Sequence, residues 1–128
     1  GLRLRFTRTA THEIESSYTA AEHFAGAPGV IHGGVQATLL DEILGVAADT
    51  AFPEGQAPKL VTVDFQLRYR RPAPLYLPLV FRGEVERVDG RKIYTRGTLH
   101  CGEQLCAEAE GLFISVPRER LTRLALED

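Results

Sequence analysis

The chain has 128 residues, of which 44% are apolar and 25% charged, the proportions of one ordinary globular domain with a core of its own. Its formal net charge of −2 argues against electrostatic attraction to nucleic acid or anionic lipid. Apolar stretches stay shorter than the roughly 20 residues that cross a bilayer, and no signal-peptide pattern is present. We therefore expect a single cytoplasmic domain over residues 1–128, although a first residue other than Met leaves open a targeting segment before it.

Strands and a loop are predicted ahead of a helix. Residues rich in β-formers alternate loosely over Leu2–Thr9 and His12–Thr19, which indicates one or two strands. The Gly and Pro content of Glu22–Gly29 indicates a loop. From Gly33 to about Thr50 the apolar residues cover more than one stripe, which is typical of a buried helix rather than a surface one.

The remainder of the chain is predicted to form four strands. Their expected bounds are Val61–Tyr69, Leu77–Val88, Ile93–Cys101 and Leu105–Val116. Tight-turn signals at Asp89-Gly90 and Gly102-Glu103 join the last three. In the first of these strands alternate residues are apolar and are expected to face the core, namely Val61, Val63, Phe65, Leu67 and Tyr69. The tail from Pro117 is expected to be a frayed helical turn.

Together these elements predict an α+β fold. One long buried helix would be wrapped by an antiparallel sheet of five to six strands. One twisted sheet covers only part of a helix that is apolar on most sides. A second copy of the chain is the simplest cover for the rest, so self-association is expected.

Two cysteines, Cys101 and Cys106, flank a short polar turn. A disulfide across a hairpin is conceivable, but a pair this sparse lacks the framework of a small secreted protein, and we expect free thiols. Only His100 lies close enough in sequence to join them, so no metal site is predicted. His12 and His23 have no acid or nucleophile at an informative spacing.

The run His32-Gly33-Gly34 at the start of the predicted helix is the first functional signal. Paired glycines at a helix start expose backbone N–H groups, and the helix dipole makes their surroundings favourable for negative charge. The carbonyl of a thioester develops such charge when it is attacked, so an oxyanion hole is one interpretation. The other is that the glycines only permit a tight entry into the helix.

Asp41 is the second signal, because an ionised carboxylate on an apolar helix is costly unless it is paired or functional. A structural carboxylate satisfied by an N–H group, or by an arginine such as Arg68 or Arg70, is the alternative. The neighbouring Glu42 points about 100° away around the helix and could itself be the base. The residues alone leave this choice open.

Eight residues separate Gly33 from Asp41, which is roughly 12 Å along a helix. An attacking atom must lie within roughly 3–3.5 Å of the carbon that it attacks. One helix therefore cannot easily present both groups to one carbonyl, whereas two antiparallel helices from two chains can. We predict a homodimer with two shared sites and leave open whether dimers pair further into a homotetramer.

An acid nine residues after the histidine of His-Gly-Gly resembles the PaaI-type branch of the hotdog-fold thioesterases in the 4HBT superfamily. Within that branch the chain is most similar to the THEM4-like acyl-CoA thioesterases. Four further motifs carry the resemblance, which covers about Phe24 to Val116: Gly26-x-Pro28-Gly29, Leu40-Asp41-Glu42, Tyr69-x-Arg71-Pro72-x-Pro74 and Gly90-Arg91-Lys92. It implies a hotdog fold and hydrolysis of an acyl-CoA to free acid and CoA, with no cofactor besides the CoA of the substrate.

The resemblance also implies roles for particular residues. The family's acid, which activates water or attacks the thioester directly, matches Asp41, and the N–H that polarises the carbonyl belongs to Gly33 or Gly34. His32 matches the motif histidine, which shapes the loop and hydrogen-bonds near the carbonyl. Thr62 matches a water-orienting Ser or Thr, although its position in the strand places it on the polar face, away from the core.

Two further positions bear on the substrate. Some relatives carry Asn or Gln six residues before the histidine, where this chain has Gly26, so a carbonyl contact from there is lost or comes from elsewhere. The phosphates of CoA need cations near the mouth of the site. The candidates for this role are Arg70, Arg71, Arg91 and Lys92.

Other functions remain as alternatives. A hotdog dehydratase or hydratase would need a histidine and carboxylate placed for proton transfer at the acyl β-carbon, and the His-Pro-Gly-type or Asp…His patterns of those enzymes are absent here. A non-catalytic acyl-CoA sensor or scaffold would use the same pocket without hydrolysis. Asp41 argues against the sensor, because a pure binder gains nothing from a carboxylate at the reacting carbon.

Overall fold

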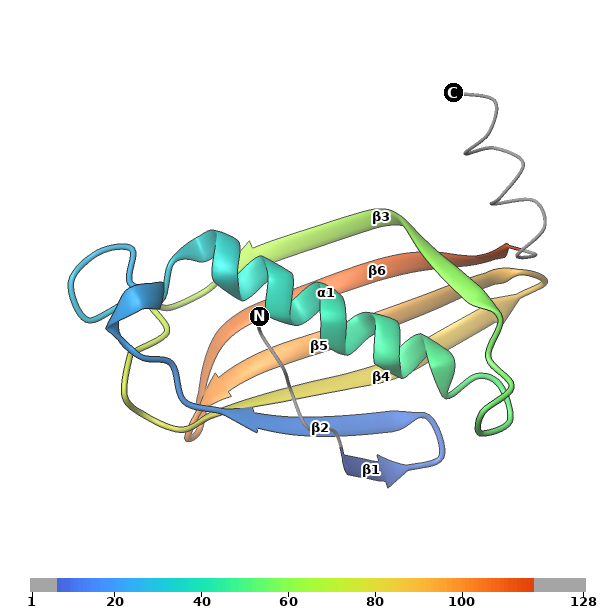
Figure 1. Ribbon diagram of the computed structural model, residues 1–128, viewed down its shortest axis with the longest axis horizontal. Helices are drawn as coiled ribbons and strands as arrows, with labels where there is room; N and C mark the ends of the chain where they lie inside the picture. Colours follow the sequence, from blue (N-terminus) through green and yellow to red (C-terminus); the bar gives the residue numbers. More distant parts are fainter. Residues whose placement is uncertain (1–6, 117–128) are drawn as a thin grey trace.

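The computed structural model describes residues 7–116. They form six strands, one long helix and a short 3-10 helix. These elements are β1 (Thr7–Ala10), β2 (Glu13–Tyr18), η1 (Glu22–Phe24), α1 (Gly33–Asp49), β3 (Lys59–Tyr69), β4 (Leu79–Asp89), β5 (Lys92–Cys101) and β6 (Gln104–Val116). Figure 1 shows α1 lying across one face of a curved sheet. The predicted architecture of one helix wrapped by an antiparallel sheet is confirmed, with six strands.

The strands are antiparallel in the order β1-β2-β4-β5-β6-β3. Three of them, β4, β5 and β6, follow one another as a meander. After α1 the chain enters β3, which pairs with β6 and forms one edge of the sheet, while β1 forms the other edge (Figure 1). Among residues 7–116 no helix combines the length and the apolar character that crossing a membrane requires.

Most predicted bounds agree with the structure to within two residues. The first strand is the main difference, because it begins at Thr7 in the part of the chain that the structure describes. The predicted residues before it lie outside the described range, as does the tail from Pro117. Glu22–Gly29 was expected to be a loop throughout, but its first three residues form the turn of η1.

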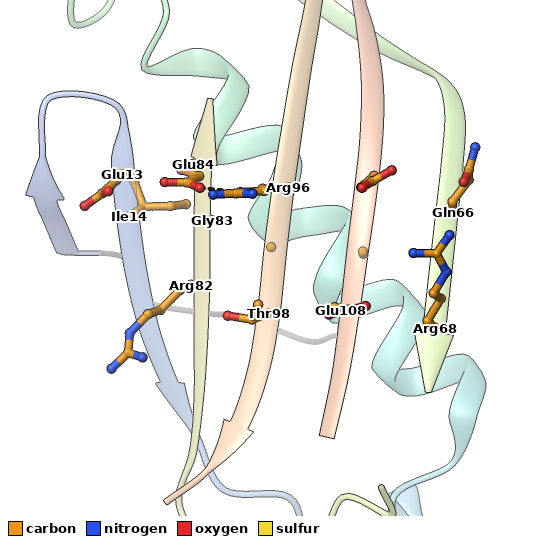
Figure 2. Close-up of a pocket in the computed structure, with 13 residues that line it drawn as sticks. Glu13, Ile14, Gln66, Arg68, Arg82, Gly83, Glu84, Arg96, Thr98 and Glu108 are labelled. Atoms are coloured by element: carbon orange, nitrogen blue, oxygen red, sulfur yellow. Dashed lines mark hydrogen bonds and ion pairs between the residues drawn. The ribbon is translucent and has the colours of Figure 1, made fainter. Parts of the chain in front are cut away.

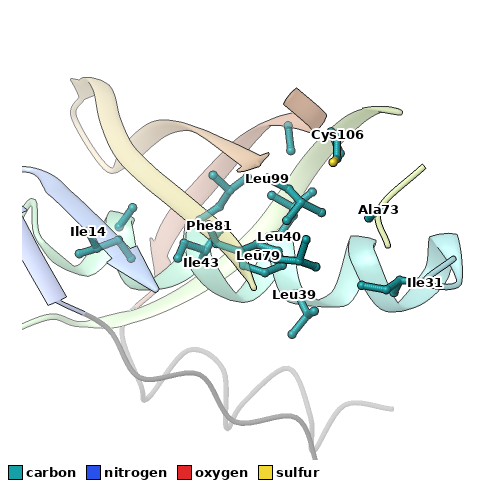
Figure 3. Packing of buried hydrophobic residues seen from close by; sticks show 14 of the residues in the cluster. Ile14, Ile31, Leu39, Leu40, Ile43, Ala73, Leu79, Phe81, Leu99 and Cys106 are labelled. Carbon is teal, nitrogen blue, oxygen red and sulfur yellow. The ribbon is translucent and has the colours of Figure 1, made fainter. Parts of the chain in front are cut away.

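The core lies between α1 and the concave face of the sheet. Figure 3 shows Leu39, Leu40 and Ile43 of the helix packed among Leu79, Phe81 and Leu99 of the strands. All of these side chains are fully buried. The opposite side of the helix carries the exposed Thr38 and Asp49, so within one chain the sheet covers only part of α1, as the sequence predicted.

Glycines in neighbouring strands let the helix approach the sheet closely. A Cβ atom added at Gly97 would lie 2.9 Å from the Arg82 carbonyl oxygen and 2.9 Å from Leu44 Cδ2. At Gly83, which pairs with Gly97 across β4 and β5, it would lie 3.2 Å from Ile43 Cγ1. A side chain at Gly97 would force the Arg82 carbonyl or the helix residue Leu44 to move, and one at Gly83 would need Ile43 to give way, so both glycines allow the close approach.

Replacing Gly97 with Ala is expected to lower the free energy of unfolding by about 1–3 kcal/mol, because the new methyl group forces the backbone of β4 or the side chain of Leu44 to move. The matched control is Gly45→Ala in α1, where the added Cβ meets only the Phe113 ring at an ordinary 3.6 Å. Helix propensity favours that change by up to about 1 kcal/mol. Urea unfolding of the two variants should move the midpoint in opposite directions; a shared direction would contradict the close packing described.

A β-bulge in β3 changes which of its residues face the helix. Thr62 pairs with Phe113 and Asp64 pairs with Leu112, so Val63 is an extra residue without a partner in β6. An extra residue reverses the side-chain alternation beyond it. The predicted single face from Val61 to Tyr69 is therefore wrong: Thr62 points toward α1, and Val63 is 50% exposed.

Candidate active site

The side chain of His32 caps the N-terminus of α1. Its Nδ1 atom accepts a hydrogen bond from the Gly34 N–H at 2.9 Å, and the residue has the extended backbone (φ −55°, ψ 136°) of an N-cap. With Nδ1 as the acceptor of this bond, the ring N–H donor is at Nε2. His32 therefore fixes the first turn and keeps one N–H donor facing outward.

The loop that carries His32 is held by neighbours on several sides. The His32 N–H donates to the Phe24 carbonyl at 2.7 Å, and the Ile31 N–H donates to the Ala73 carbonyl at 2.8 Å. Gln36, only 4% exposed, donates from Nε2 to the Ile31 carbonyl at 3.0 Å. Sequence reasoning missed Gln36, since one polar residue on an apolar helix gives no signal of such a contact.

The two glycine N–H groups differ in whether they have a hydrogen-bond acceptor. The Gly34 N–H is bound to His32 Nδ1. In the preceding peptide, which joins His32 to Gly33, the His32 carbonyl accepts hydrogen bonds from the Val35 and Gln36 N–H groups at 3.1 and 3.2 Å. Within residues 7–116 the Gly33 N–H has no acceptor. The choice between Gly33 and Gly34 therefore favours Gly33 as the N–H that is open to a ligand.

Asp41 lies two turns further along α1 and contacts β3. Its Oδ1 accepts a hydrogen bond from Thr62 Oγ1 at 3.2 Å, and the residue is half-buried. The bulge at Val63 makes this contact possible, because it turns Thr62 from the outer face of the sheet to the helix face. An uninterrupted strand would have separated the two side chains.

The interpretation of Asp41 as a carboxylate neutralised by Arg68 or Arg70 is wrong. Arg70 binds Glu108 instead, with Nη2 and Nε 2.6 and 3.2 Å from Oε1, and this hydrogen bonding lowers the pKa of the Glu108 carboxyl. Arg68 pairs with Glu108 in the register of β3 and β6 and belongs to the outer face of the sheet. Among residues 7–116 the partner of Asp41 is thus a hydroxyl and not a cation.

Glu42, the alternative base, lies elsewhere. It borders a groove of about 420 Å³ between the C-terminal half of α1 and the start of β3. Asp49 borders the same groove, and although the residue as a whole is exposed, partial desolvation of its carboxyl raises the pKa. Thr62 is not part of this lining. The structure therefore separates the two neighbouring acids, and it gives Asp41 the hydroxyl partner.

The four cations proposed for the phosphates of CoA do not gather within one chain. Arg70 and Arg71 follow the end of β3, where Arg71 also hydrogen-bonds Gln104. Arg91 and Lys92 lie at the β4–β5 turn, where the Arg91 carbonyl accepts from the Ser115 N–H. These are opposite ends of the sheet, since β6 runs from near Arg71 to near Arg91.

A second hollow, of about 390 Å³, lies on the face of the sheet opposite to α1 (Figure 2). Its sides are charged residues of neighbouring strands, and Arg96 forms an ion pair with Glu84 there. None of the candidate residues His32, Gly33, Asp41 or Thr62 borders it. We therefore place the candidate site on the helix side of the sheet.

The cysteines are free thiols, as expected from their number and spacing. Cys106 is buried, and burial raises the pKa of its thiol. In the described part of the chain no group of three or more His, Cys, Asp or Glu residues is placed to hold a metal ion.

Comparison with protein families identifies the class of protein. Residues 28–108 match the model of the thioesterase superfamily, and the chain belongs to that family. It is 31% identical over 107 residues to the acyl-coenzyme A thioesterase THEM4 of Mus musculus, which covers 82% of this chain and 44% of that protein. Human THEM5 is 26% identical over 104 residues, covering 80% of this chain and 40% of that protein. The chain spans about half the length of the curated relatives it matches.

Solved structures agree with this assignment. A crystallised thioesterase superfamily protein is 38% identical, with a TM-score of 0.78 and coverage of 87% of this chain and 55% of that one. A protein of Streptococcus mutans, crystallised with acetyl-CoA, has a TM-score of 0.79 at 16% identity, covering 91% and 90%. The phenylacetic acid degradation protein PaaI of Thermus thermophilus has a TM-score of 0.76 at 19% identity, covering 88% and 93%. The last two show the shared fold.

Proposed function

We propose that this protein hydrolyses an acyl-CoA thioester to a free acid and CoA. The observation that carries the proposal is that α1 carries both an open donor, the Gly33 N–H at its start, and, two turns further along, a carboxylate, Asp41, that accepts a hydrogen bond from the Thr62 hydroxyl. Relatives named acyl-coenzyme A thioesterases support it, as does the acetyl-CoA bound to the Streptococcus mutans protein of the same fold.

In this mechanism the carbonyl oxygen of the thioester lies at the Gly33 N–H, where the positive end of the helix dipole favours the charge that develops. Asp41 removes a proton from a water molecule whose oxygen bonds to the carbonyl carbon. The carbon–sulfur bond then breaks, and the CoA thiolate takes up a proton. In the second route an Asp41 carboxylate oxygen bonds to the carbon itself, the carbon–sulfur bond breaks to release the CoA thiolate, and water then opens the resulting anhydride to the free acid and Asp41.

The site is proposed to be shared between two chains. In the sheet formed by residues 7–116, β3 is an edge strand of 11 residues, and its outer backbone groups can pair with another strand. Antiparallel pairing of β3 with its copy about a two-fold axis directs Gly33 of one chain toward Asp41 of the partner subunit. The same arrangement brings Arg70 and Arg71 to the end where the partner's Arg91 and Lys92 lie, so that all four can face the phosphates.

His32 has an added role in this proposal because of Gly26. Relatives with Asn or Gln at that position have a side chain to offer the carbonyl, which this chain lacks. A Cβ atom at Gly26 would lie 3.1 Å from His32 Cα, so the loop is packed tightly there. The Nε2–H of His32, which the bond at Nδ1 leaves free, is the group that we propose as a second donor to the carbonyl oxygen.

A panel of acyl-CoAs, with released thiol detected by a chromogenic reagent, tests the proposed activity. Release of CoA from at least one acyl class at a rate proportional to enzyme concentration is expected. Tight binding of CoA esters without thiol release would instead favour the acyl-CoA sensor. Elimination or hydration of an enoyl or hydroxyacyl ester, with the thioester intact, would favour the dehydratase or hydratase.

Replacing Thr62 with Val is expected to lower kcat about tenfold, because one hydrogen bond to a charged group is worth about 1.5–3 kcal/mol and part of that orientation is lost. Thr62→Ser is the control, since it keeps the hydroxyl and should stay within about threefold of the wild-type rate. Steady-state kinetics on the best acyl-CoA of the panel measure both. Equal rates for the Val and Ser variants would contradict a role of the Thr62 hydroxyl in catalysis.

A further inference from the structure

Tyr69, the last residue of β3, contacts the helix start. Its hydroxyl donates to the Gly33 carbonyl at 2.6 Å. The phenol also fills the space beside Gly33, where a Cβ atom would lie 3.1 Å from the hydroxyl oxygen and 3.3 Å from Cζ. The alternation of β3 predicts a core-facing residue here, but the side chain is 52% exposed because β3 is at the edge of the sheet.

The Tyr69 and His32 contacts meet on a single peptide group. The Gly33 carbonyl, bound by Tyr69, and the Gly34 N–H, bound by His32 Nδ1, belong to the same planar unit. Hydrogen bonds at both ends fix the rotation of that plane. Both glycines lie in the first turn of α1, where intrahelical hydrogen bonds also hold the backbone, but neither has a side chain to restrict it further.

The peptide on the other side of Gly33 is fixed as well. Its carbonyl, that of His32, accepts from the Val35 and Gln36 N–H groups, and its N–H is the open donor. Of the four polar groups on these two peptides, three are therefore engaged within the chain. The remaining one, the Gly33 N–H, has its direction set by the other three.

We propose that Tyr69 is a positioning residue, which together with His32 clamps the Gly33–Gly34 peptide and so aims the Gly33 N–H at the substrate carbonyl. This inference rests on the proposed thioesterase function and adds to it a residue that acts through the glycine backbone. Because Thr62 and Tyr69 are on the same strand, β3 holds both Asp41 and the open N–H in place. A donor that is misplaced by about 1 Å can cost up to about 100-fold in rate.

Tyr69→Phe tests the clamp, because it removes the hydroxyl and keeps the ring. We expect kcat to fall about tenfold with KM within about twofold, since the lost bond affects the carbonyl in the transition state more than binding of the substrate. Tyr94→Phe is the control: Tyr94 lies on the outer face of the sheet under Arg87, and its variant should keep the wild-type rate.

Hydrogen exchange of the Gly34 amide gives a second readout that does not require activity. Release of the clamp should speed exchange at Gly34 in Tyr69→Phe and leave it unchanged in Tyr94→Phe. A Gly33→Ala, Tyr69→Phe double variant should be no slower in turnover than the worse single variant, because both changes act on the same contact.

The two proposals fail separately. An unchanged Gly34 exchange rate in Tyr69→Phe overturns the clamp, whatever the enzyme does. An unchanged kcat in Tyr69→Phe, while Asp41→Asn is inactive, overturns the positioning role and leaves the thioesterase. A wild-type protein that releases no thiol from any acyl-CoA overturns the proposed function, and the exchange measurement then still decides whether the clamp exists.

Discussion

Replacing Asp41 with Asn is expected to lower kcat about 100- to 10,000-fold, the contribution typical of a positioned general acid or base. The amide has the same shape as the carboxylate, and its oxygen can still accept the Thr62 hydrogen bond. It can neither take a proton from water nor attack the thioester. Thermal unfolding and the oligomeric state of the variant should therefore match those of the wild type, and only turnover should change.

Glu42→Gln is the matched control for Asp41→Asn. Both are acid-to-amide changes on neighbouring residues of α1, but Glu42 faces the groove at the C-terminal half of the helix and not Thr62. Its kcat should remain within about threefold of the wild type, the range expected for a surface charge away from the reaction. An active Asp41→Asn beside an inactive Glu42→Gln would show that the acid has been assigned to the wrong residue.

Replacing Gly33 with Pro is expected to lower kcat about 100- to 1,000-fold, because it deletes the backbone N–H that is proposed to bind the carbonyl oxygen. Proline is tolerated at the first position of a helix, where the missing N–H has no partner in the helix. His32 already has the extended backbone (ψ 136°) that a residue before proline requires. Circular dichroism should therefore show the helix intact.

Gly33→Ala separates loss of the N–H from crowding at the same position. Its Cβ meets the Tyr69 hydroxyl just as the proline ring does, but the N–H remains. We expect its loss of activity to be about tenfold, as in Tyr69→Phe, and far smaller than that of Gly33→Pro. Similar losses in the Ala and Pro variants would mean that crowding of Tyr69, and not the missing donor, causes the effect.

Much of the fold follows from local patterns in the sequence. The broad apolar face over Leu39–Ala48 and the alternation of the later strands predict one helix against an antiparallel sheet, because each pattern reflects which side of an element is buried. The place of His32-Gly33-Gly34 at the start of the helix was also predictable, because paired glycines there precede the broad apolar run. The distance between Gly33 and Asp41 along the helix was predictable as well, because it follows from the rise per residue alone.

What the sequence could not predict depends on contacts between distant segments. The orientation of Thr62 follows from the bulge at Val63, which is defined by pairing with β6 and has no signature in the alternation itself. The choice between Gly33 and Gly34 depends on the rotamer of His32, and the partner of Arg70 depends on the register that places Glu108 beside it. Tyr69 was predicted to face the core because nothing local reveals an edge strand.

The central claim is that each site combines Gly33 of one chain with Asp41 of the partner subunit. Co-expression of Asp41→Asn and Gly33→Pro chains with different affinity tags, followed by purification on both tags, yields heterodimers that test it. If the sites are shared, one site of the heterodimer combines the unmutated Gly33 with the unmutated Asp41, and the other site carries both substitutions. The heterodimer should therefore recover about half of the wild-type activity, although each homodimer is nearly inactive. Heterodimers no more active than the two homodimers would contradict the claim, because every site would then lie within a single damaged chain.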